Sequence, residues 1–339
     1  MKKVNDMDSV TQIALGAAVG EAVLGRKVGR PALLWGAGCG LLPDLDVLIP
    51  LGDAVKDFTY HRSASHSLLV LALLTPLVVK GILKCHPKTT SHRMRWHVLV
   101  FLAFATHVLL DCLTVYGTQI FWPLPVPPVM WSTIFIVDPV YSVPLIGGVI
   151  AAFVLSRDKG WGHTVNTACL AISCIYLTWT VAAKVHVGHV VKQSLSQQGI
   201  QYNRFLTVPT PFNSFLWRII VIDDLTYHEG VYSVFDTSRN LVFKSYSNDR
   251  HLLRGLDHHW PVKRLQWFTQ GFYSVLDNAD DIIIRDLRMG MEPTYVFQFR
   301  VGRIKGQDRV PAKSLRISPE IELDALGLIW RRIWNQDPP

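Results

Sequence analysis

Long apolar blocks separated by short polar segments fill the first half of the chain. Four of these blocks have the roughly 17 to 21 residues needed to cross about 30 Å of hydrocarbon. They predict membrane-spanning helices over Ser67–Leu83, Trp96–Val115, Pro139–Leu155 and Thr164–Lys184.

Two weaker apolar blocks precede these four. Ser9–Gly25 is rich in Ala and Gly and carries Glu21, which we interpret as a partner for a neighbouring helix. Leu33–Leu51 is interrupted by a Pro-Asp-x-Asp segment. Small residues allow helices to approach closely in lipid, and both blocks carry glycines four residues apart. We therefore predict an α-helical integral membrane bundle of about six spans, with close packing at Gly16, Gly20, Gly36 and Gly40.

The pattern changes after about residue 192, where apolar runs shorten and begin to alternate with polar positions. This alternation predicts strands, and one stretch, Val262–Leu276, has helical periodicity. We expect two domains, a helical membrane domain over residues 1–191 and a small β-rich α+β extramembrane domain over residues 192–339. The predicted strands are Leu216–Ile222, Val231–Phe235, Leu241–Tyr246, Ile282–Asp286 and Tyr295–Val301.

Composition supports a membrane protein and argues against a nucleic-acid binder. Hydrophobic residues make up 49% of the 339 residues and charged residues only 18%, which excludes a disordered chain or a coiled coil. The net charge of +8 is spread thinly, with 15 basic against 10 acidic residues in 1–191 and 19 against 16 in 192–339. Neither half is basic enough to follow a phosphate backbone. The five cysteines show no CxxC spacing, so we expect buried free thiols.

Lysine and arginine set the expected orientation. The short segments after the first, third and fifth predicted spans hold ten of them, and the opposite short segments hold four. The positive-inside rule then places both termini and the C-terminal domain outside the cytoplasm. The ten are Arg26, Lys27, Arg30, Lys80, Lys84, Lys88, Arg93, Arg95, Arg157 and Lys159, and the four are Lys2, Lys3, Lys56 and Arg62.

Acidic residues and histidines gather at the outer ends of the spans in this topology. Polar groups inside membrane spans are unfavourable and usually functional, so their convergence at one depth predicts a site. The candidate metal ligands are Asp44, Asp46, His61, His66, His107 and Asp111, with Asp8 and Asp138 as weaker candidates. Arg62 lies among them and could hold a phosphate or carboxylate.

Two spacings among these residues carry structural information. His107 and Asp111 are four apart and lie on one face of a helix, where both could bind one metal. Asp44 and Asp46 are two apart, so they converge only if Pro43 interrupts the helix there. We also expect Ser63 or Ser65 to cap the third span, which would place His66 in its first turn.

Each pair alone has an ordinary interpretation. Asp44 and Asp46 fit a surface loop, His61 and His66 fit the membrane interface, and His107 with Asp111 fits a structural hydrogen bond. Asp8 and Asp138 could simply cap helices. The joint occurrence on one side favours a divalent metal site of one or two ions. Imidazole and carboxylate without thiolate suit zinc, manganese or iron, and zinc or manganese is expected here.

At these residues the sequence resembles the bacterial membrane-bound metal-dependent hydrolase family, the YdjM-like inner-membrane proteins. The resemblance is carried by Met7–Gln12, Pro43–Asp46, His61–Ser67, His107–Asp111 and Tyr116–Thr118, and later by Pro209–Asn213 and Leu216–Arg218. Gln12 stands where many members carry His, and Ser63 where many carry Gly. The resemblance implies a metal-dependent hydrolase of the bacterial inner membrane, and the orientation expected from the basic residues then places the C-terminal domain in the periplasm.

The expected function is hydrolysis of an ester or phosphoester by a metal-activated water. We expect membrane lipids to be its partners and the substrate to be a lipid or lipid-linked molecule. Catalytic candidates are Asp111 or Asp46 as general base and Arg62 as anion holder. A metal or proton transporter using the same residues is one alternative. A structural membrane protein whose outer domain binds partners is another.

Overall fold

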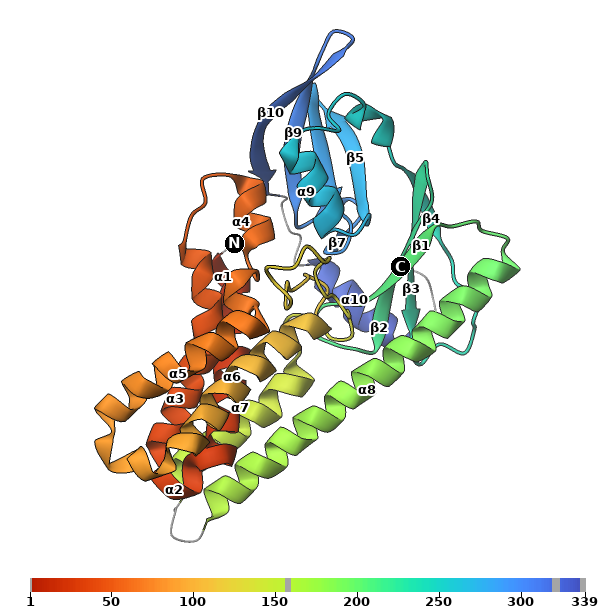
Figure 1. The fold of residues 1–339 in the computed structure, drawn as a ribbon. Coiled ribbons are helices and arrows are strands. Elements are labelled where there is room, and N and C mark those ends of the chain that lie inside the picture. Colours follow the sequence, from red (N-terminus) through yellow and green to blue (C-terminus); the bar gives the residue numbers. More distant parts are fainter. Residues whose placement is uncertain (1, 156–159, 319–323, 336–339) are drawn as a thin grey trace. The chain divides into compact units, whose positions relative to one another are not determined.

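The computed structural model describes residues 2–155, 160–318 and 324–335. The described chain forms helices first and two four-stranded sheets afterwards (Figure 1). It divides into two compact units, and the second takes up two short segments from the first half of the chain. The first unit contains residues 1–49, 62–131 and 136–180, and the second contains 50–61, 132–135 and 181–339.

The first unit is built from helices. Its elements are α1 (Lys2–Gly20), the π-helical turn η1 (Glu21–Gly25), α2 (Arg26–Val28), α3 (Arg30–Leu41), the 3₁₀ segments η2 (Leu42–Leu48), η3 (Ala64–His66) and η4 (Pro87–His92), α5 (Leu68–Cys85), α6 (Arg93–Leu113), α7 (Pro139–Val154) and the first part of α8 (Trp161–Gln197). Helix α6 is the most buried, because its apolar side chains Trp96, Leu99, Val100 and Phe104 belong to the central core of the unit.

Helices α1 and α3 pack backbone to backbone through glycines, as the small-residue spacing predicts. A Cβ atom built on Gly16 would overlap the carbonyl oxygen of Gly36, and one on Gly20 would overlap that of Ala32. A Cβ on Gly40 would overlap the carbonyl oxygen of Gln12. Any side chain at these positions would therefore force the helices apart.

Three helical segments of the described chain are long and apolar enough to cross a membrane, not the six predicted. They are Leu68–Cys85, Pro87–Leu113 and Trp161–Gln197, and a shorter apolar helix covers Pro139–Val154. The two N-terminal blocks do form helices. However, α3 has only 12 residues before η2, and at 1.5 Å per residue it covers about 18 Å.

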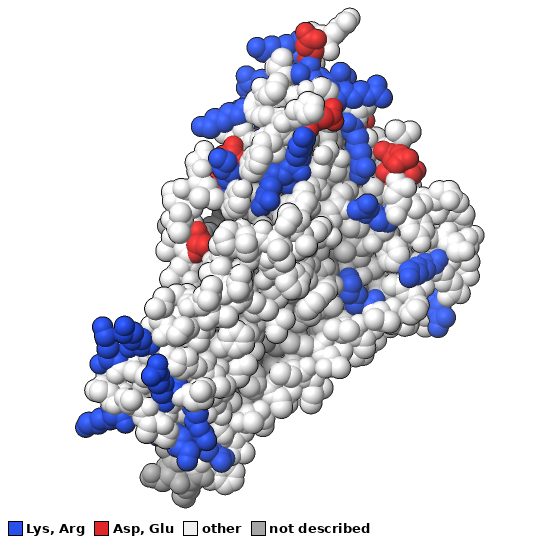
Figure 2. All heavy atoms as spheres, viewed as in Figure 1, with Lys and Arg blue, Asp and Glu red and all other residues white. Residues whose placement is uncertain are grey.

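The sides of this helical unit carry no charged side chains in the face drawn in Figure 2. In the face drawn in Figure 2, Lys and Arg gather at the end that carries α2 and η4, and the helix flanks beyond it are uncharged. The exposed basic residues at this end are Arg26, Lys27, Lys80, Lys84, Lys88, Arg93 and Arg95. An uncharged flank bounded by basic residues is typical of a helical membrane domain.

The second unit contains two four-stranded antiparallel sheets and a small two-stranded one, β7-β8. The first has the order β1-β2-β3-β4, and the second has the order β10-β9-β6-β5. The strands are β1 (Arg204–Pro209), β2 (Leu216–Ile222), β3 (Thr226–Ser233), β4 (Lys244–Ser247), β5 (Tyr273–Asn278), β6 (Asp281–Asp286), the short β7 (Gly290–Met291) and β8 (Thr294–Tyr295), β9 (Gln298–Lys305) and β10 (Asp308–Ile317). The helical elements are α4 (Ala54–Tyr60), η5 (Arg250–Leu253), α9 (Trp260–Phe268) and α10 (Asp324–Trp334).

The β-rich character of this half is confirmed, but one predicted element is wrong. The helix expected over Val262–Leu276 ends at Phe268, and the rest forms strand β5. Gln270 and Gly271 both have positive φ angles, which end the helix and turn the chain. The sequence pattern resembles one continuous helix because both α9 and β5 bury their apolar side chains.

Two segments from the first half of the chain complete the second unit. Phe58 of α4 packs against the rings of Phe268, Phe297 and Phe299, with centroid distances of 4.9, 4.4 and 5.0 Å. Arg264 donates to the hydroxyl and the carbonyl oxygen of Thr59, both at 3.0 Å. Helix α8 runs without interruption through residue 191, the predicted domain boundary, and packs against β2.

The cysteines differ in part from the sequence interpretation. Cys39 and Cys112 are buried free thiols as expected, but Cys85 and Cys174 are exposed. The helices that carry them are uncovered in the isolated chain, so an apolar sequence context did not imply burial. Glu229 is a charged residue that is buried in strand β3.

Glu229 lies at the centre of a polar network inside the second unit. It accepts hydrogen bonds from the guanidinium of Arg218 and the hydroxyl of Tyr295, and its other oxygen accepts from the amide of Glu292. The Glu229 carboxylate raises the pKa of Arg218 against the effect of burial. A buried charge of this kind is tolerated because it is paired and hydrogen-bonded.

Candidate metal centre

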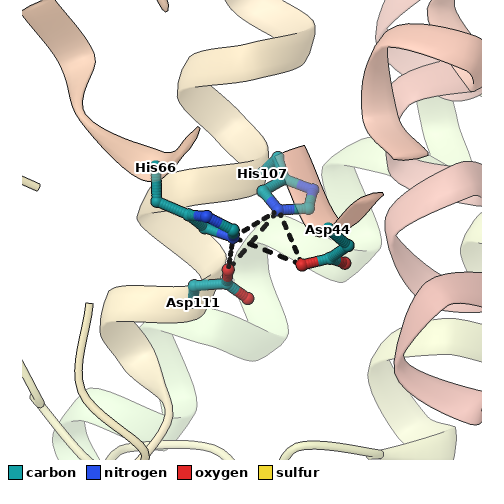
Figure 3. Close-up of side chains that lie close together, drawn as sticks. All are labelled: Asp44, His66, His107 and Asp111. Carbon is teal, nitrogen blue, oxygen red and sulfur yellow. Dashed lines mark hydrogen bonds and ion pairs between the residues drawn. The ribbon is translucent and has the colours of Figure 1, made fainter. Parts of the chain in front are cut away.

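Four side chains of the first unit meet at one point (Figure 3). Asp44 comes from η2, His66 from η3, and His107 and Asp111 from α6. One ligand atom of each lies within 4.8 Å of the others. His66, His107 and Asp111 are buried, and the Asp44 side chain is 12% exposed. Among the described residues this is the one group of at least three such ligands.

Local structure explains why these four converge. Helix α3 ends at Leu41, and Pro43 opens a 3₁₀ segment that carries Asp44 away from the helix axis. His66 closes the 3₁₀ turn η3 directly before α5, whose N-cap is Ser67 and not Ser63 or Ser65. The last turns of α6 present His107 and Asp111 on one face because the residues are four apart.

The distances within the group match the edges of a small coordination polyhedron. The Nε2 atom of His66 lies 3.2 Å from Oδ1 of Asp44 and 3.1 Å from Oδ2 of Asp111. The Nε2 atom of His107 lies 3.5 and 3.4 Å from the same two oxygens, and the two Nε2 atoms are 3.2 Å apart. A tetrahedron with ligand bonds of about 2.0 to 2.1 Å has edges of roughly 3.3 to 3.4 Å. The group therefore has the dimensions of a four-ligand metal site.

Hydrogen bonds on the outer nitrogens orient both imidazoles. Nδ1 of His107 lies 2.7 Å from the carbonyl oxygen of Gly40, which can only accept. The Oγ of Ser65 donates to Oδ2 of Asp46 at 2.6 Å, so its lone pair accepts from Nδ1 of His66 at 2.9 Å. These partners assign the proton of each neutral ring to Nδ1 and leave both Nε2 lone pairs facing the centre. Hydrogen-bond partners on the outer ring nitrogen hold histidine ligands in this way in metal sites.

The two carboxylate oxygens of Asp111 have different surroundings. Its Oδ1 accepts a hydrogen bond from Nε2 of Gln12 at 2.9 Å and lies 3.2 Å from the guanidinium of Arg62. Its Oδ2 is buried without any hydrogen-bond partner and faces the two Nε2 atoms. A buried carboxylate oxygen in this state is strongly unfavourable unless a cation approaches it. The orphaned oxygen therefore fits a metal ligand.

Arg62 is held close to this carboxylate by its backbone and its neighbours. The residue has a φ of +60° and is 3% exposed. Its guanidinium donates to Oγ1 of Thr114 at 3.2 Å and lies 5.2 Å from the ring centre of Tyr116. Its backbone amide donates to Oδ2 of Asp46 at 3.1 Å. Arg62 thus compensates the charge of Asp111 from the side opposite the ligands.

The remaining predicted ligands lie outside the four-residue group. Asp46 is in the outer shell, with Oδ2 3.9 Å from Nδ1 of His66. His61 follows α4 in the second unit. Asp138 caps α7 by accepting from the amide of Val140 at 2.9 Å and also accepts from the hydroxyl of Tyr176. The side chain of Asp8 lies outside the described residues.

Three residues of the outer shell escaped the sequence interpretation. The sequence predicts Ser65 only as a helix cap, and the carbonyl of Gly40 offers no side-chain signal. Gln12 has no ligand pattern in the sequence, yet it donates to Asp111 and is fully buried. The spacing of the ligands along the sequence gives no indication of these contacts, because they involve distant backbone atoms and short polar side chains.

The set of two imidazoles and two carboxylates suits a divalent ion of intermediate softness. No thiolate is present in the group, and the described residues supply four ligands for one ion. The ligand Asp44 and the neighbouring Asp46, which lies outside the four-residue group, have side chains that are 12% and 17% exposed, whereas Asp111 is 1% exposed. The centre is therefore approached from the η2 side.

Comparison with known proteins places this arrangement in a family. The sequence profile of the YdjM inner membrane protein family matches residues 7–187, which include all four ligands, the candidate spans Leu68–Cys85 and Pro87–Leu113, and most of Trp161–Gln197. The resemblance expected beyond residue 187 stays a prediction. No curated protein and no solved structure matches the chain significantly. Because the profile covers more than half of its residues, the chain belongs to the YdjM inner membrane protein family.

Proposed function

We propose that this protein is a membrane-bound hydrolase that depends on a divalent metal held by Asp44, His66, His107 and Asp111. The observation that carries the proposal is the buried Oδ2 of Asp111, which has no hydrogen-bond partner and faces two imidazole nitrogens. A divalent ion bound there would polarise an ester or phosphoester and lower the pKa of an attacking water. Zinc and manganese fit the donor set best.

The residues of the chain have distinct roles in this proposal. Ser65 and the Gly40 carbonyl keep the histidines in the ligand tautomer. Arg62 and Gln12 keep Asp111 ionised and fix its rotamer. Asp46, a carboxylate outside the ligand set and on the exposed side, is our candidate for the group that accepts a proton from water.

The substrate class follows from the surroundings of the centre. The ligands sit at one end of α6, a helix long and apolar enough to cross a membrane. The basic residues of the first unit gather at the α2 and η4 end, and the positive-inside rule assigns that end to the cytoplasm. We therefore propose a lipid or lipid-linked ester or phosphoester as substrate, approached from the periplasmic side of the inner membrane.

Metal analysis combined with hydrolysis assays tests the proposal. The full chain, purified in detergent with added phospholipid, should hold about one transition-metal ion per chain by elemental analysis. It should hydrolyse at least one of a nitrophenyl ester, a bis(nitrophenyl) phosphate and a phospholipid. His107→Ala should abolish both properties. His97→Ala is the matched control, because His97 is on the same helix and only bonds the carbonyl oxygen of Arg93.

Two results would oppose the proposal. A well-folded wild-type chain that binds no transition metal would remove the centre itself. A metal-loaded chain whose hydrolysis is unchanged by His107→Ala would separate the metal from the chemistry. Circular dichroism of the variants distinguishes loss of the site from loss of the fold.

One observation favours transport as a second candidate function. Glu21 is 4% exposed in the π-helical turn η1, and its Oε1 lies 3.6 Å from Nδ1 of His163 on α8. Buried acid–histidine pairs in membrane helices are typical of ion and proton pathways. The test is metal uptake into proteoliposomes, measured with a metal-sensitive dye trapped inside. Uptake by a wild-type chain that shows no hydrolysis would favour transport over the first function, provided that Glu21→Gln and His107→Ala each abolish the uptake.

A further inference from the structure

The end of the second unit carries an exposed aromatic patch. Helix α10 exposes Leu328, Trp330 and Trp334 at 58%, 47% and 68%, while Ile333 is buried. Trp330 and Trp334 are four residues apart and so share a face of the helix. Phe235, 47% exposed, stacks on the ring of Trp334 with centroids 4.9 Å apart. We call Phe235, Leu328, Trp330 and Trp334 the aromatic patch.

The patch is held firmly in place by polar contacts beneath it. The hydroxyl of Ser233 donates to the carbonyl oxygen of Ile333 at 2.7 Å. The guanidinium of Arg332 donates to both carboxylate oxygens of Asp236, at 2.8 and 2.7 Å. Such a bidentate pair gives the contact a defined geometry. The exposed rings are therefore presented by fixed backbone and are not loose side chains of a frayed end.

Contacts within the second unit locate the patch along helix α8. The ammonium of Lys184 lies 5.8 Å from the ring centre of Trp217 at the start of β2, and His186 lies 6.2 Å from Tyr232 at the end of β3. Phe215 lies two residues before Trp217 and stacks on Phe235, at 5.7 Å. The patch therefore adjoins the strand ends that lie at the level of residues 184–186.

The surface of α8 changes character at this same level. Its exposed apolar side chains, Ile172, Ile175, Trp179, Val181 and Val185, end at Val185. Beyond it, Lys192, Gln193, Ser196 and Gln197 are exposed. The exposed face of a membrane helix is apolar inside the hydrocarbon and polar outside it, so α8 leaves the membrane near Val185. An aromatic patch at that level falls in the interfacial zone.

We propose that the aromatic patch inserts into the lipid interface and anchors the second unit to the membrane surface from which α8 emerges. Exposed Trp and Leu side chains on α10, with Phe235 stacked beside Trp334 and the basic Arg331 among them, have the composition of an interfacial segment. Its position at the level where the exposed apolar surface of α8 ends favours lipid over a soluble partner protein. Arg331, exposed between the two tryptophans, suits the phosphate groups of anionic phospholipids.

Site-directed fluorescence in vesicles tests this anchor. Leu328→Cys carries an environment-sensitive fluorophore in a chain whose accessible cysteines, Cys85, Cys169 and Cys174, are replaced by Ala, since Cys39 and Cys112 are buried. The protein is reconstituted into phosphatidylethanolamine and phosphatidylglycerol vesicles with and without doxyl-labelled acyl chains. We expect blue-shifted emission, quenching by the doxyl lipids and protection from aqueous iodide.

A label at Gln307 is the matched control, because this exposed residue lies in the β9–β10 turn of the same unit. It should be quenched by iodide and unaffected by doxyl lipids. Equal behaviour of the two labels overturns the proposal. Protection of residue 328 from both quenchers also overturns it, because that result means that protein covers the patch. If the label disturbs folding, intrinsic tryptophan fluorescence provides the same test. Doxyl lipids should then quench the double variant Trp330→Leu/Trp334→Leu less than the wild type, and equal quenching overturns the proposal.

Discussion

The Nδ1 atom of His107 lies 2.7 Å from the carbonyl oxygen of Gly40, which joins the metal ligand on α6 to the glycine contact between α1 and α3. The same contact brings Gln12 of α1 next to Asp111. The backbone of Gln12 lies so close to Gly40 that a Cβ there would overlap its carbonyl oxygen, and the Gln12 side chain donates to Asp111. Helix packing and ligand orientation therefore depend on the same few backbone atoms. Glycine at these positions serves the centre as well as the fold.

Substitution of Gly36 should separate α1 from α3. A Cβ there would overlap the carbonyl oxygen of Gly16, which is backbone and cannot rotate away. Gly36→Ala should destabilise the protein by about 1–3 kcal/mol, as for other overpacked positions, and weaken metal binding. Gly38→Ala on the same helix meets nothing within 4 Å and should be neutral or slightly stabilising. Thermal unfolding in detergent compares the two, and equal midpoints would contradict the glycine contact.

Removal of the Ser65 hydroxyl should weaken metal binding without removing a ligand. Ser65→Ala breaks the connection from Asp46 to His66, so the imidazole loses the acceptor that fixes its tautomer. Loss of such a partner lowers metal affinity by about 10–100-fold. Ser65→Thr keeps the hydroxyl and should recover most of the affinity. Competition with a chelator measures all three chains, and an unchanged affinity of Ser65→Ala would show that the hydroxyl has no part in the centre.

Much of the architecture could be predicted because it depends on local pattern. Runs of apolar residues predict helices α5 to α8, and alternation predicts a β-rich second half, with β2 found at its expected bounds. The glycine spacing predicts close packing of α1 and α3. Six membrane spans are not confirmed, because three segments of the described residues are long and apolar enough, and composition does not reveal that α3 gives way to a 3₁₀ segment after Leu41.

The candidate site was less accessible to sequence reasoning for a different reason. Its ligand types follow from the unfavourable burial of acids and histidines, but the division of Asp44 and Asp46 between inner and outer shells depends on the turn of η2. Positions i and i+2 diverge in a 3₁₀ segment of three residues per turn. Helix α4 packs in the second unit through ring contacts with residues more than 200 positions away in the sequence, and no local pattern encodes such contacts.

The buried pair of Arg62 and Asp111 should be sensitive to removal of either partner. Asp111→Asn takes away a metal ligand and leaves the guanidinium of Arg62, 3% exposed, without its carboxylate. Breaking a buried pair in this way typically destabilises a protein by about 3–5 kcal/mol. The double variant Arg62→Met/Asp111→Asn should recover part of this stability but bind no metal. If the single variant unfolds at the wild-type temperature, the pair contributes nothing to stability.

The segment that connects Asp46 to His66 gives the second unit an influence on the centre. This connection contains α4, and Phe58 of α4 is buried among three phenylalanines of the second unit. Phe58→Ala should destabilise the second unit by about 3–5 kcal/mol, as expected for a core phenylalanine. It should also lower metal affinity, because the chain on either side of the released helix holds the outer-shell carboxylate and a ligand.

Lys56→Ala provides the matched control for Phe58→Ala, because Lys56 is an exposed residue of the same helix. Its replacement should leave both unfolding and metal affinity unchanged. Chelator competition at a temperature where circular dichroism shows Phe58→Ala to be folded separates the effect on the centre from unfolding. If metal affinity is the same in all three chains, the ligands are held by the helical unit alone and α4 only fastens the chain to the second unit. A lowered affinity in the folded variant would instead show that the packing of Phe58 sets the spacing of Asp46 and His66.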